Sequence, residues 1–446
     1  MTNDLTKGSI TKHLIYLSIP MIIGITANMS FNIIDTYFIS KLGINQLTAI
    51  SFSFPVIMFL MNLAIGFAIG TGSVLSRLVG GGNNEKVKQI STLTIVLGFS
   101  SSIILTLIGI FNIDSLFTLL GADKEQLIFI NEYMVYAYMG MGFRMASISV
   151  SGTFRAHGIT KVPSYSIIMA TILNTILDPI FIFGFGDFPA LGIEGAGLAT
   201  LLANGLAFLY EFYIASIKFE FFAKINELTK EAFQYIQDIV RIAIPASISN
   251  ALNPLSLSYA NFLLSEKNTD FVAGFGVATK VQFFTMIPIL ALSAAISSVV
   301  GQNYGKENFL RVKETIKISL IFSCLYAVIQ IFVLSIFANE LVSLFDIKTE
   351  KALDYSIDYI FYISFTLWGY FFVIVINSLS NAINKPLKAL LLISLRTFIL
   401  FVPAYYIFEF YDFHRPVIFG IAISNILSGV YSYILYNSHK ENILKN

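Results

Sequence analysis

Two aspartates inside otherwise apolar segments are the residues of this chain best suited to chemistry. Asp35 lies late in an apolar segment at 13–39, and Asp178 lies late in another at 162–186. If these segments cross a membrane, an ionised residue within them costs about 2.5 to 3.5 kcal/mol on insertion scales and usually faces a cavity or a partner. We therefore expect both carboxylates at similar depth, in the outer half of their spans, at a site for an ion or a proton.

Each acid is preceded by an amide on the same helical face. Asn32 precedes Asp35 by three residues, and Asn174 precedes Asp178 by four. Residues three and four apart are neighbours on a helix surface. Asn32 is thus a candidate for substrate contact or a secondary role, together with Tyr133 in the fourth apolar segment.

Uncharged oxygens complete the expected ion-coupling set of Asp35, Asn174, Asp178 and Thr200. Pro179 has no N–H for the carbonyl of Thr175, which leaves that oxygen available to water or an ion. Thr200 ends a run of small residues in the next segment, at a comparable depth. A hard cation such as Na+ prefers several such oxygens, whereas a proton needs only a carboxylate. The pattern fits Na+ and H+ equally, and no other metal or cofactor is expected.

Other charges within apolar segments have several interpretations. Lys280 and Arg396 are candidates for an anionic substrate group or a lipid headgroup, or their long side chains reach the membrane surface. Arg144 is expected to bond interior carbonyls or an acid. Glu211 lies near a segment end, where we expect its carboxylate to reach the surface.

The composition identifies the elements that must position these residues. The 446 residues are 56% hydrophobic and 12% charged, with a mean hydropathy of +0.75 and a net charge of +1. A membrane core about 30 Å thick requires about 20 apolar residues per helix. Twelve such runs occur, near 13–39, 49–77, 89–112, 126–153, 162–186, 191–217, 236–265, 271–300, 314–337, 352–381, 387–411 and 416–438. The sequence therefore predicts an all-α protein with twelve transmembrane helices.

The remaining composition excludes several classes of function. No basic tract with interleaved aromatics occurs, so no nucleic-acid partner is expected. Cys324 is the single cysteine and cannot form an intrachain disulfide. No HExxH or Walker-type motif is present, so we expect no enzyme and no ATP hydrolysis. Transport by this chain would then draw its energy from an ion gradient.

Basic residues predict the orientation, because Lys and Arg in short loops are retained in the cytoplasm. Eighteen lie in loops on the side of the N-terminus. Six lie on the other side: Lys41, Lys124, Lys267, Lys348, Lys351 and Arg415. Both termini are therefore predicted to be cytoplasmic, in the inner membrane of a prokaryote.

The chain contains an internal repeat at an offset of 225 residues. Ser18-Ile19-Pro20 matches Ala243-Ile244-Pro245, and SVLSRLVGGGNNEKVK from Ser73 resembles SSVVGQNYGKENFLRVK from Ser297. We predict two pseudosymmetric six-helix lobes around a central cavity, at 1–217 and 236–446, joined by an amphipathic cytoplasmic linker at 218–235. Parallel repeats of this kind allow a transporter to rock about a central site. The alternatives are a plain solvated linker and a duplicated scaffold without transport.

The internal repeat helps to decide whether Asp35 and Asp178 have a functional or an architectural role. The alternative to an ion site is that Asp35 lies at a hydrated helix end and that Asp178 is a structural hydrogen-bonding residue. The second half has Ser258, Tyr259 and Ala260 opposite Asp35, and Phe401 and Val402 opposite Asp178. A purely architectural need should recur in both halves, so the one-sided acids favour a functional role.

Over nearly its whole length the chain resembles the multidrug and toxic compound extrusion (MATE) transporters. The resemblance rests on Pro20 with Asp35, the run to Gly80-Gly81-Gly82, RAHGITKVPSY, NTILDPIFIFG from Asn174, LGIEGAGLAT ending at Thr200, GQNYGKEN from Gly301, and the turn Lys385-Pro386 leading to Arg396. It implies alternating access and exchange of cationic or amphipathic drugs for Na+ or H+. The four ion-coupling residues match the family's acidic site, and Pro20 matches a hinge proline.

The seventh span carries Asn253 and Pro254 where some branches of this family have an acid, which favours the DNA-damage-inducible (DinF)-like branch. We expect a monomer that binds drug-like small molecules and membrane lipids. A lipid-linked saccharide flippase of the same superfamily is the alternative, since Lys280, Arg396 and Arg144 could bind a pyrophosphate. An intramembrane enzyme or a non-transporting scaffold is a further alternative.

Overall fold

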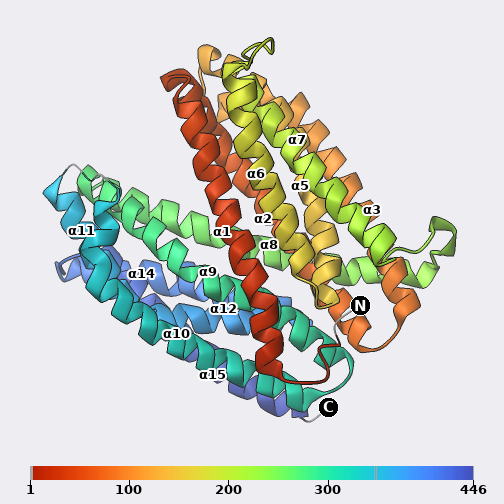
Figure 1. Ribbon diagram of the computed structural model, residues 1–446. Helices are drawn as coiled ribbons and strands as arrows, with labels where there is room; N and C mark the ends of the chain where they lie inside the picture. Colours follow the sequence, from red (N-terminus) through yellow and green to blue (C-terminus); the bar gives the residue numbers. More distant parts are fainter. Residues whose placement is uncertain (1–3, 346, 348, 445–446) are drawn as a thin grey trace. The chain divides into compact units, whose positions relative to one another are not determined.

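In a computed structural model, long helices account for nearly all of the chain (Figure 1). The structure describes residues 4–345, 347 and 349–444, and the side chains of these residues up to 438. The helices are α1 Ile10–Ser40, α2 Ile44–Gly80, α3 Asn84–Phe111, α4 Ile113–Leu119, α5 Lys124–Ala156, α6 Lys161–Phe183, α7 Gly192–Tyr213, α8 Lys230–Ser265, α9 Thr269–Gly305, α10 Phe309–Ser343, α11 Glu350–Ser364, α12 Leu367–Ala382, α13 Pro386–Ser394, α14 Phe401–Phe410 and α15 Pro416–Leu444.

These helices match the twelve predicted spans. Within the described residues, nine continuous segments are long and apolar enough to cross a membrane, and the pair α11 and α12 forms a tenth, bent span. The other two spans, α5 and α8, have 33 and 36 residues but are less apolar. Many large apolar side chains are exposed along the helices, for example Val328, Phe332 and Ile33. Such surfaces suit lipid and not water.

Two predicted spans are less regular than expected. The tenth, predicted as one helix at 352–381, bends by 58° between α11 and α12. At the bend, Thr366 Oγ1 accepts a hydrogen bond from Asn425 Nδ2 at 3.2 Å. A Cβ on Gly369 would lie 2.1 Å from the carbonyl oxygen of Asn425, so α15 packs directly on the start of α12. The eleventh span contains a π-helical turn, Leu395–Leu400, between α13 and α14.

By internal packing the chain divides into two units, and the first contains Ile19–Ser247. Its central helix is α5, which packs against α2, α3 and α7. Glycines permit these close approaches, because a Cβ on Gly197 of α7 would lie 2.8 Å from the carbonyl oxygen of Tyr133 on α5. The small residues of the predicted run 195–200 therefore bring α7 against α5. A Cβ on Gly195 would likewise lie 2.4 Å from the carbonyl oxygen of Phe181 on α6.

The second unit contains Leu5–Ser18 and the chain from Ile248 onward. One continuous apolar core joins α9, α10, α12 and α15 and includes Leu5, Ile10, Leu14 and Leu17. The N-terminal segment is also held by polar contacts from the motif that begins at Gly301. Leu5 N–H donates to Gln302 Oε1 at 2.9 Å, Asn303 Nδ2 donates to Leu5 O at 3.2 Å, and Arg311 Nη1 donates to Gly8 O at 3.0 Å.

The packing units and the predicted lobes divide the chain differently. The chain passes from one unit to the other within α1, after Ser18, and within α8, after Ser247. The predicted boundaries at 217 and 236 follow the sequence repeat, and movement of the chain as those lobes remains a prediction. The predicted linker is irregular at 219–224 and 228–229, has a short helical turn at Ile225–Glu227, and from Lys230 onward belongs to α8. Its Phe221 is buried and stacks on His157, whereas Ile225 is exposed.

Candidate functional site

Four helices of the first unit position the predicted ion-coupling residues. Asp35 lies on α1, Tyr133 on α5, Asn174 and Asp178 on α6, and Thr200 on α7. Asp178 and Asn174 are 0% exposed and Asp35 is 7% exposed, in helices that are otherwise apolar. The helical spacing places Asn174 one turn before Asp178, as the sequence predicts. Carboxylates and an amide, which are costly to bury in apolar surroundings without partners, therefore meet in one place.

Direct contacts join three of these side chains. Asn174 Nδ2 donates a hydrogen bond to Asp178 Oδ1 at 2.9 Å and lies 3.5 Å from Thr200 Oγ1. The carboxylate of Asp178 lies close enough to Asp35 for their charges to interact, and the hydroxyl of Tyr133 lies close enough to interact with both carboxylates. The structure thus brings together Asp35, Tyr133, Asn174, Asp178 and Thr200.

Three buried oxygens at this site have no hydrogen-bond donor in the described part of the chain. They are Asp35 Oδ1, Asn174 Oδ1 and Asp178 Oδ2. A buried polar atom without a partner is uncommon and is explained by strain, by a functional role or by an unseen water or ion. Carboxylate, amide and hydroxyl oxygens are suitable ligands for Na+, and the same carboxylates can take up protons. Among the described residues no group of three or more His, Cys, Asp or Glu side chains gathers for a transition metal.

Two further predicted residues, Asn32 and Pro20, lie on the same helix as Asp35. Asn32 is exposed, and its Nδ2 donates to the carbonyl of Asn28 at 2.9 Å. Pro20 lies inside α1, one residue after the chain enters the first unit at Ile19. Thr171 Oγ1 on α6 donates to the carbonyl of Ala27 at 3.1 Å, which fixes α1 beside α6 between these two positions.

Lys280 and Arg396 belong to the second unit and not to the unit that holds the acids. Lys280 is exposed, with its Nζ 6.0 Å from the ring centre of Phe345. The guanidinium of Arg396 lies 3.4 Å from the ring centre of Tyr370. Its Nε donates to Asn425 Oδ1 at 2.8 Å and its Nη1 to Asn253 Oδ1 at 3.2 Å.

Two of the three guanidinium nitrogens of Arg396 therefore have protein partners, at the level of the bend between α11 and α12. Tyr370 also donates to Asn253, at 3.2 Å, so one amide oxygen serves both side chains. Asn253, which the sequence marks only as a departure from an acidic branch, is the neutral partner of a partly buried cation. This role of Asn253 can be recognised only from its contact with Arg396 in the folded structure.

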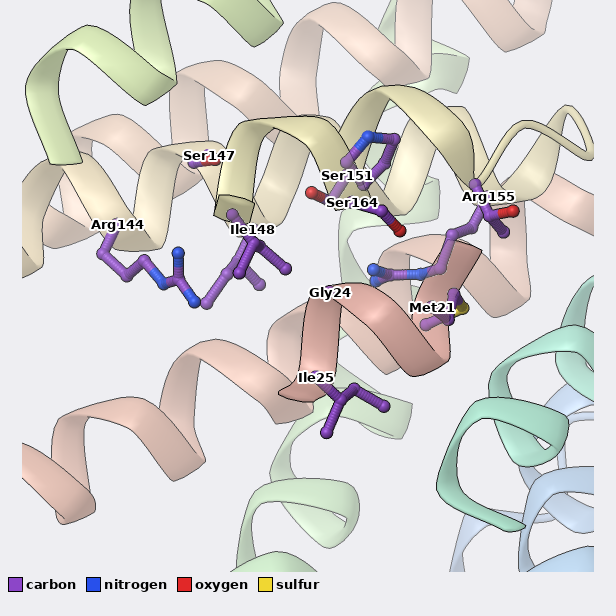
Figure 2. A pocket seen from close by; sticks show the side chains of 12 residues that line it. Met21, Gly24, Ile25, Arg144, Ser147, Ile148, Ser151, Arg155 and Ser164 are labelled. Carbon is purple, nitrogen blue, oxygen red and sulfur yellow. The ribbon is translucent and has the colours of Figure 1, made fainter. Parts of the chain in front are cut away.

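Glu211 corrects the expectation that its carboxylate reaches the membrane surface. It is 0% exposed, and it accepts hydrogen bonds from Ser147 at 2.5 Å and from Ser151 at 2.6 Å. These serines line a pocket together with Arg144 and Arg155 (Figure 2). The serines lie four residues apart on α5, and this spacing was the signal in the sequence that could have indicated a shared polar partner.

A protein-family model described as MatE matches residues 20–180 and 245–407, which is most of the chain in two repeats. A curated relative from Shewanella oneidensis, named FAD transporter, is 31% identical over 433 residues, 97% of this chain and 96% of its own length. The multidrug export protein MepA of Staphylococcus aureus is 28% identical over 350 residues, 78% of this chain and 76% of its own.

Solved structures agree along the whole chain. An outward-facing multidrug resistance MATE family transporter has a TM-score of 0.93 and 25% identity, with 100% of both chains covered. A MATE transporter of Vibrio cholerae in a bent form has a TM-score of 0.91 and 26% identity, with 97% of this chain and 98% of that chain covered. The arrangement of twelve helices in two lobes is therefore that of these transporters.

Proposed function

Because the chain belongs to the MATE family of membrane transporters, we propose that it is a secondary active antiporter that exports cationic or amphipathic small molecules in exchange for Na+ or H+. The observation that carries this proposal is the set of Asp35, Asn174, Asp178 and Thr200, of which the first three are buried and have oxygens that lack a donor. Export proceeds by alternating access of the two lobes. No cofactor is required, since the ion gradient supplies the energy.

The coupling follows from linkage between the ion and the drug. A ligand shifts a conformational equilibrium only by its difference in affinity for the two states. An antiporter therefore needs the ion to favour the state that releases the drug, and the drug must in turn weaken ion binding by the same factor. Neutralising the buried charges of Asp35 and Asp178, by Na+ or by protons, is the step that favours one state.

We place the protein in the inner membrane as a monomer in contact with lipids, with both termini in the cytoplasm. The excess of Lys and Arg on the side of the N-terminus supports this orientation. A cysteine reporter placed after His439 and labelled from outside intact cells measures it. Labelling without permeabilisation would contradict the orientation.

The decisive experiment is transport in proteoliposomes with Na+ and H+ gradients imposed separately. We expect efflux of a cationic dye to follow one of the two gradients and to stop when that gradient is removed. Drug affinity in detergent should fall as the coupling ion rises, since the two compete through the same equilibrium. A drug affinity that depends on neither Na+ nor pH would contradict antiport.

The choice of ion can be tested at Thr200. If Na+ drives transport, Thr200→Val removes a ligand oxygen and should weaken the effect of Na+ on drug binding about tenfold, while drug binding without Na+ changes little. If protons drive transport, the same variant should leave the pH dependence almost unchanged. Efflux that follows a pH gradient in both proteins assigns the coupling to the carboxylates alone.

Export of a phosphorylated organic anion is a second candidate function. The Shewanella oneidensis relative that aligns with 97% of this chain is named FAD transporter, which makes flavins suitable substrates to test. The guanidinium groups of Arg144 and Arg155 in the pocket of the first unit favour this candidate on chemical grounds. Loading the proteoliposomes with FAD or with a cationic dye, and comparing gradient-driven release, separates the two candidates.

A further inference from the structure

The pocket that Arg144 and Arg155 line is separate from the ion site. Its walls come from α1, α5 and α6, and it has a volume of about 70 Å³. A pocket of this volume holds a few water molecules, so it suits one small polar group. It lies toward the end of α5 that is predicted to face the cytoplasm, whereas Asp35 and Asp178 are placed toward the opposite end.

The geometry of α5 brings the two guanidinium groups into this one pocket. Arg144 and Arg155 are eleven residues apart, which is about three helical turns and about 16 Å of rise, so both side chains leave the same face. Ser147 and Ser151 occupy the turns between them. In Figure 2 the two arginine side chains extend toward one another from opposite ends of the pocket, along the face that α5 presents to Gly24 and Met21 of α1.

The pocket carries an excess of positive charge. Arg144 Nη2 donates to Asn28 Oδ1 at 2.7 Å, a neutral partner. The guanidinium of Arg155 forms no hydrogen bond or ion pair with the described part of the chain, although it interacts with the charge of Glu211. The nearest acid behind the wall is Glu211, and Ser147 and Ser151 both donate to it. Two arginines and one glutamate leave a formal charge of +1.

A further hydroxyl adds hydrogen-bonding capacity to the same wall. Thr160 lines the pocket and is 1% exposed, and its Oγ1 is a buried atom without a partner in the described residues. A guanidinium and a hydroxyl without partners, in a small pocket of positive charge, are the groups that bind tetrahedral oxyanions.

We propose that this pocket binds the phosphate group of an organic phosphate. The group forms charge-assisted hydrogen bonds with Arg155 and Arg144 and accepts a further hydrogen bond from Thr160. The phosphate can belong to a soluble substrate or to an anionic lipid headgroup, since both reach the predicted cytoplasmic end. The transport role of the pocket rests on the proposed function, but its binding can be measured without transport.

The experiment compares FMN with riboflavin, which share a fluorescent ring and differ by one phosphate. Affinities are measured by fluorescence with the purified full-length protein in detergent. We expect the wild type to prefer FMN, and Arg155→Gln to reduce FMN affinity about tenfold or more, because a hydrogen bond to a charged group contributes about 1.5 to 3 kcal/mol. Riboflavin affinity should not change.

Matched variants make the result specific. Arg241→Gln, the same substitution at an exposed arginine of α8, should leave FMN binding unchanged. Arg155→Lys keeps the charge without the planar fork and should give an intermediate affinity. Glu211→Gln removes the negative charge and should strengthen FMN binding. Arg144→Gln is a secondary test, because loss of the hydrogen bond from Arg144 to Asn28 can impair folding.

Lipid nanodiscs identify the source of the phosphate. If an anionic lipid occupies the pocket, FMN affinity should fall as phosphatidylglycerol replaces phosphatidylcholine, and Arg155→Gln should abolish that competition. A wild type with neither an FMN preference nor a phosphatidylglycerol effect overturns the proposal, as does an FMN preference that Arg155→Gln leaves intact. Either result can coexist with ion-driven dye efflux, so failure of this site is distinguishable from failure of the proposed antiport.

Discussion

The buried carboxylates can be tested one residue at a time. We expect Asp35→Asn and Asp178→Asn each to abolish gradient-driven efflux while the protein folds normally, because an amide keeps hydrogen-bonding atoms but cannot ionise. Asn174 Nδ2 can still donate to the oxygen of an amide at position 178, so the contact of 2.9 Å need not be lost. Dye efflux and thermal unfolding of each purified variant measure the two effects separately.

The control for both substitutions is Asp187→Asn, in the exposed loop between α6 and α7. It makes the same chemical change at a hydrated carboxylate and should leave efflux and unfolding unaltered. Wild-type efflux in both Asp35→Asn and Asp178→Asn would remove these acids from the mechanism.

At the scale of single residues, the sequence predicts a functional role for polar residues that are unusual within apolar spans. It does not predict roles that depend on which residues lie nearby in the folded structure. Asp35, Asn174, Asp178 and Thr200 were identifiable because polar groups are rare in apolar spans and helical spacing pairs two of them. The roles of Glu211, Asn253 and Asn425 depend on partners at least 29 residues away in sequence, so no pattern in the residues beside them indicates these roles. The expectation for Glu211 was wrong because its depth in the span was judged without the serines of α5.

Helix α7 depends on a glycine for its contact with α5. Gly197→Ala would place a Cβ 2.8 Å from the carbonyl oxygen of Tyr133, so one helix must move. Overpacking of this kind costs about 1 to 3 kcal/mol. We expect a lower midpoint of thermal unfolding and reduced efflux, since Tyr133 and Thr200 lie on the two helices concerned.

Gly205→Ala is the matched control on the same helix. A Cβ there meets Phe143 at 3.7 Å, an ordinary van der Waals contact. Alanine is also the better helix former by about 1 kcal/mol, so stability should hold or rise. Equal destabilisation by both substitutions would show that α7 is sensitive to any added methyl and not to the approach at Gly197.

The segment Leu5–Gly8 is tied to α9 and α10 by side chains of one short motif. Arg311→Gln removes hydrogen bonds to Gly8 O at 3.0 Å and Leu5 O at 3.4 Å, and another to Asn303 Oδ1 at 3.1 Å. We expect hydrogen exchange at the amide of Leu5 to become about tenfold faster, because the lost bonds are together worth about 1 to 2 kcal/mol.

Lys317→Gln, at an exposed position of α10, should not change that exchange rate. Unchanged protection of Leu5 in Arg311→Gln would mean that apolar packing of Leu5 alone holds the segment. The repeated motif at 297–313 drew attention in the sequence through its likeness to 73–88, but its partner could not be predicted. That partner lies about 300 residues earlier in the chain.

Element by element, the twelve spans follow from hydropathy because a membrane of fixed thickness demands long apolar runs. The bend at Thr366 and the π-helical turn from Leu395 do not follow from hydropathy. Gly369 follows Thr366 by three residues, Pro403 follows the last residue of the π-helical turn by three, and both irregularities contact α15 through Asn425. Contacts between spans, and not the composition of one span, determine where a helix departs from regularity.

At the scale of the whole molecule, α1 is a continuous helix whose two ends belong to different packing units. Pro20 lies one residue after the chain enters the first unit and removes one backbone hydrogen-bond donor there. We expect Pro20→Ala to slow efflux several-fold while the unfolding midpoint holds or rises, because alanine restores the donor and stiffens the helix. Dye efflux and thermal unfolding measure the two.

Pro55→Ala is the comparison, since Pro55 lies inside α2, wholly within the first unit. It should affect efflux less than Pro20→Ala does. If both variants transport like the wild type, bending of α1 at Pro20 plays no part in the cycle.

The exchange of helix ends between the units has a consequence for biogenesis. Residues 230–247 complete the core of the first unit through Ala232, Ile239 and Ile242, although they follow the first six spans in the chain. A ribosome that has finished the first six spans has therefore made a bundle that still lacks part of its own packing. The packing of this bundle is completed only after the seventh span has been made. Leu5–Ser18 can pack only after α9 and α10 have been made, which is later still. Genes split at residue 225 should thus yield two fragments that are degraded when expressed singly and rescued when expressed together.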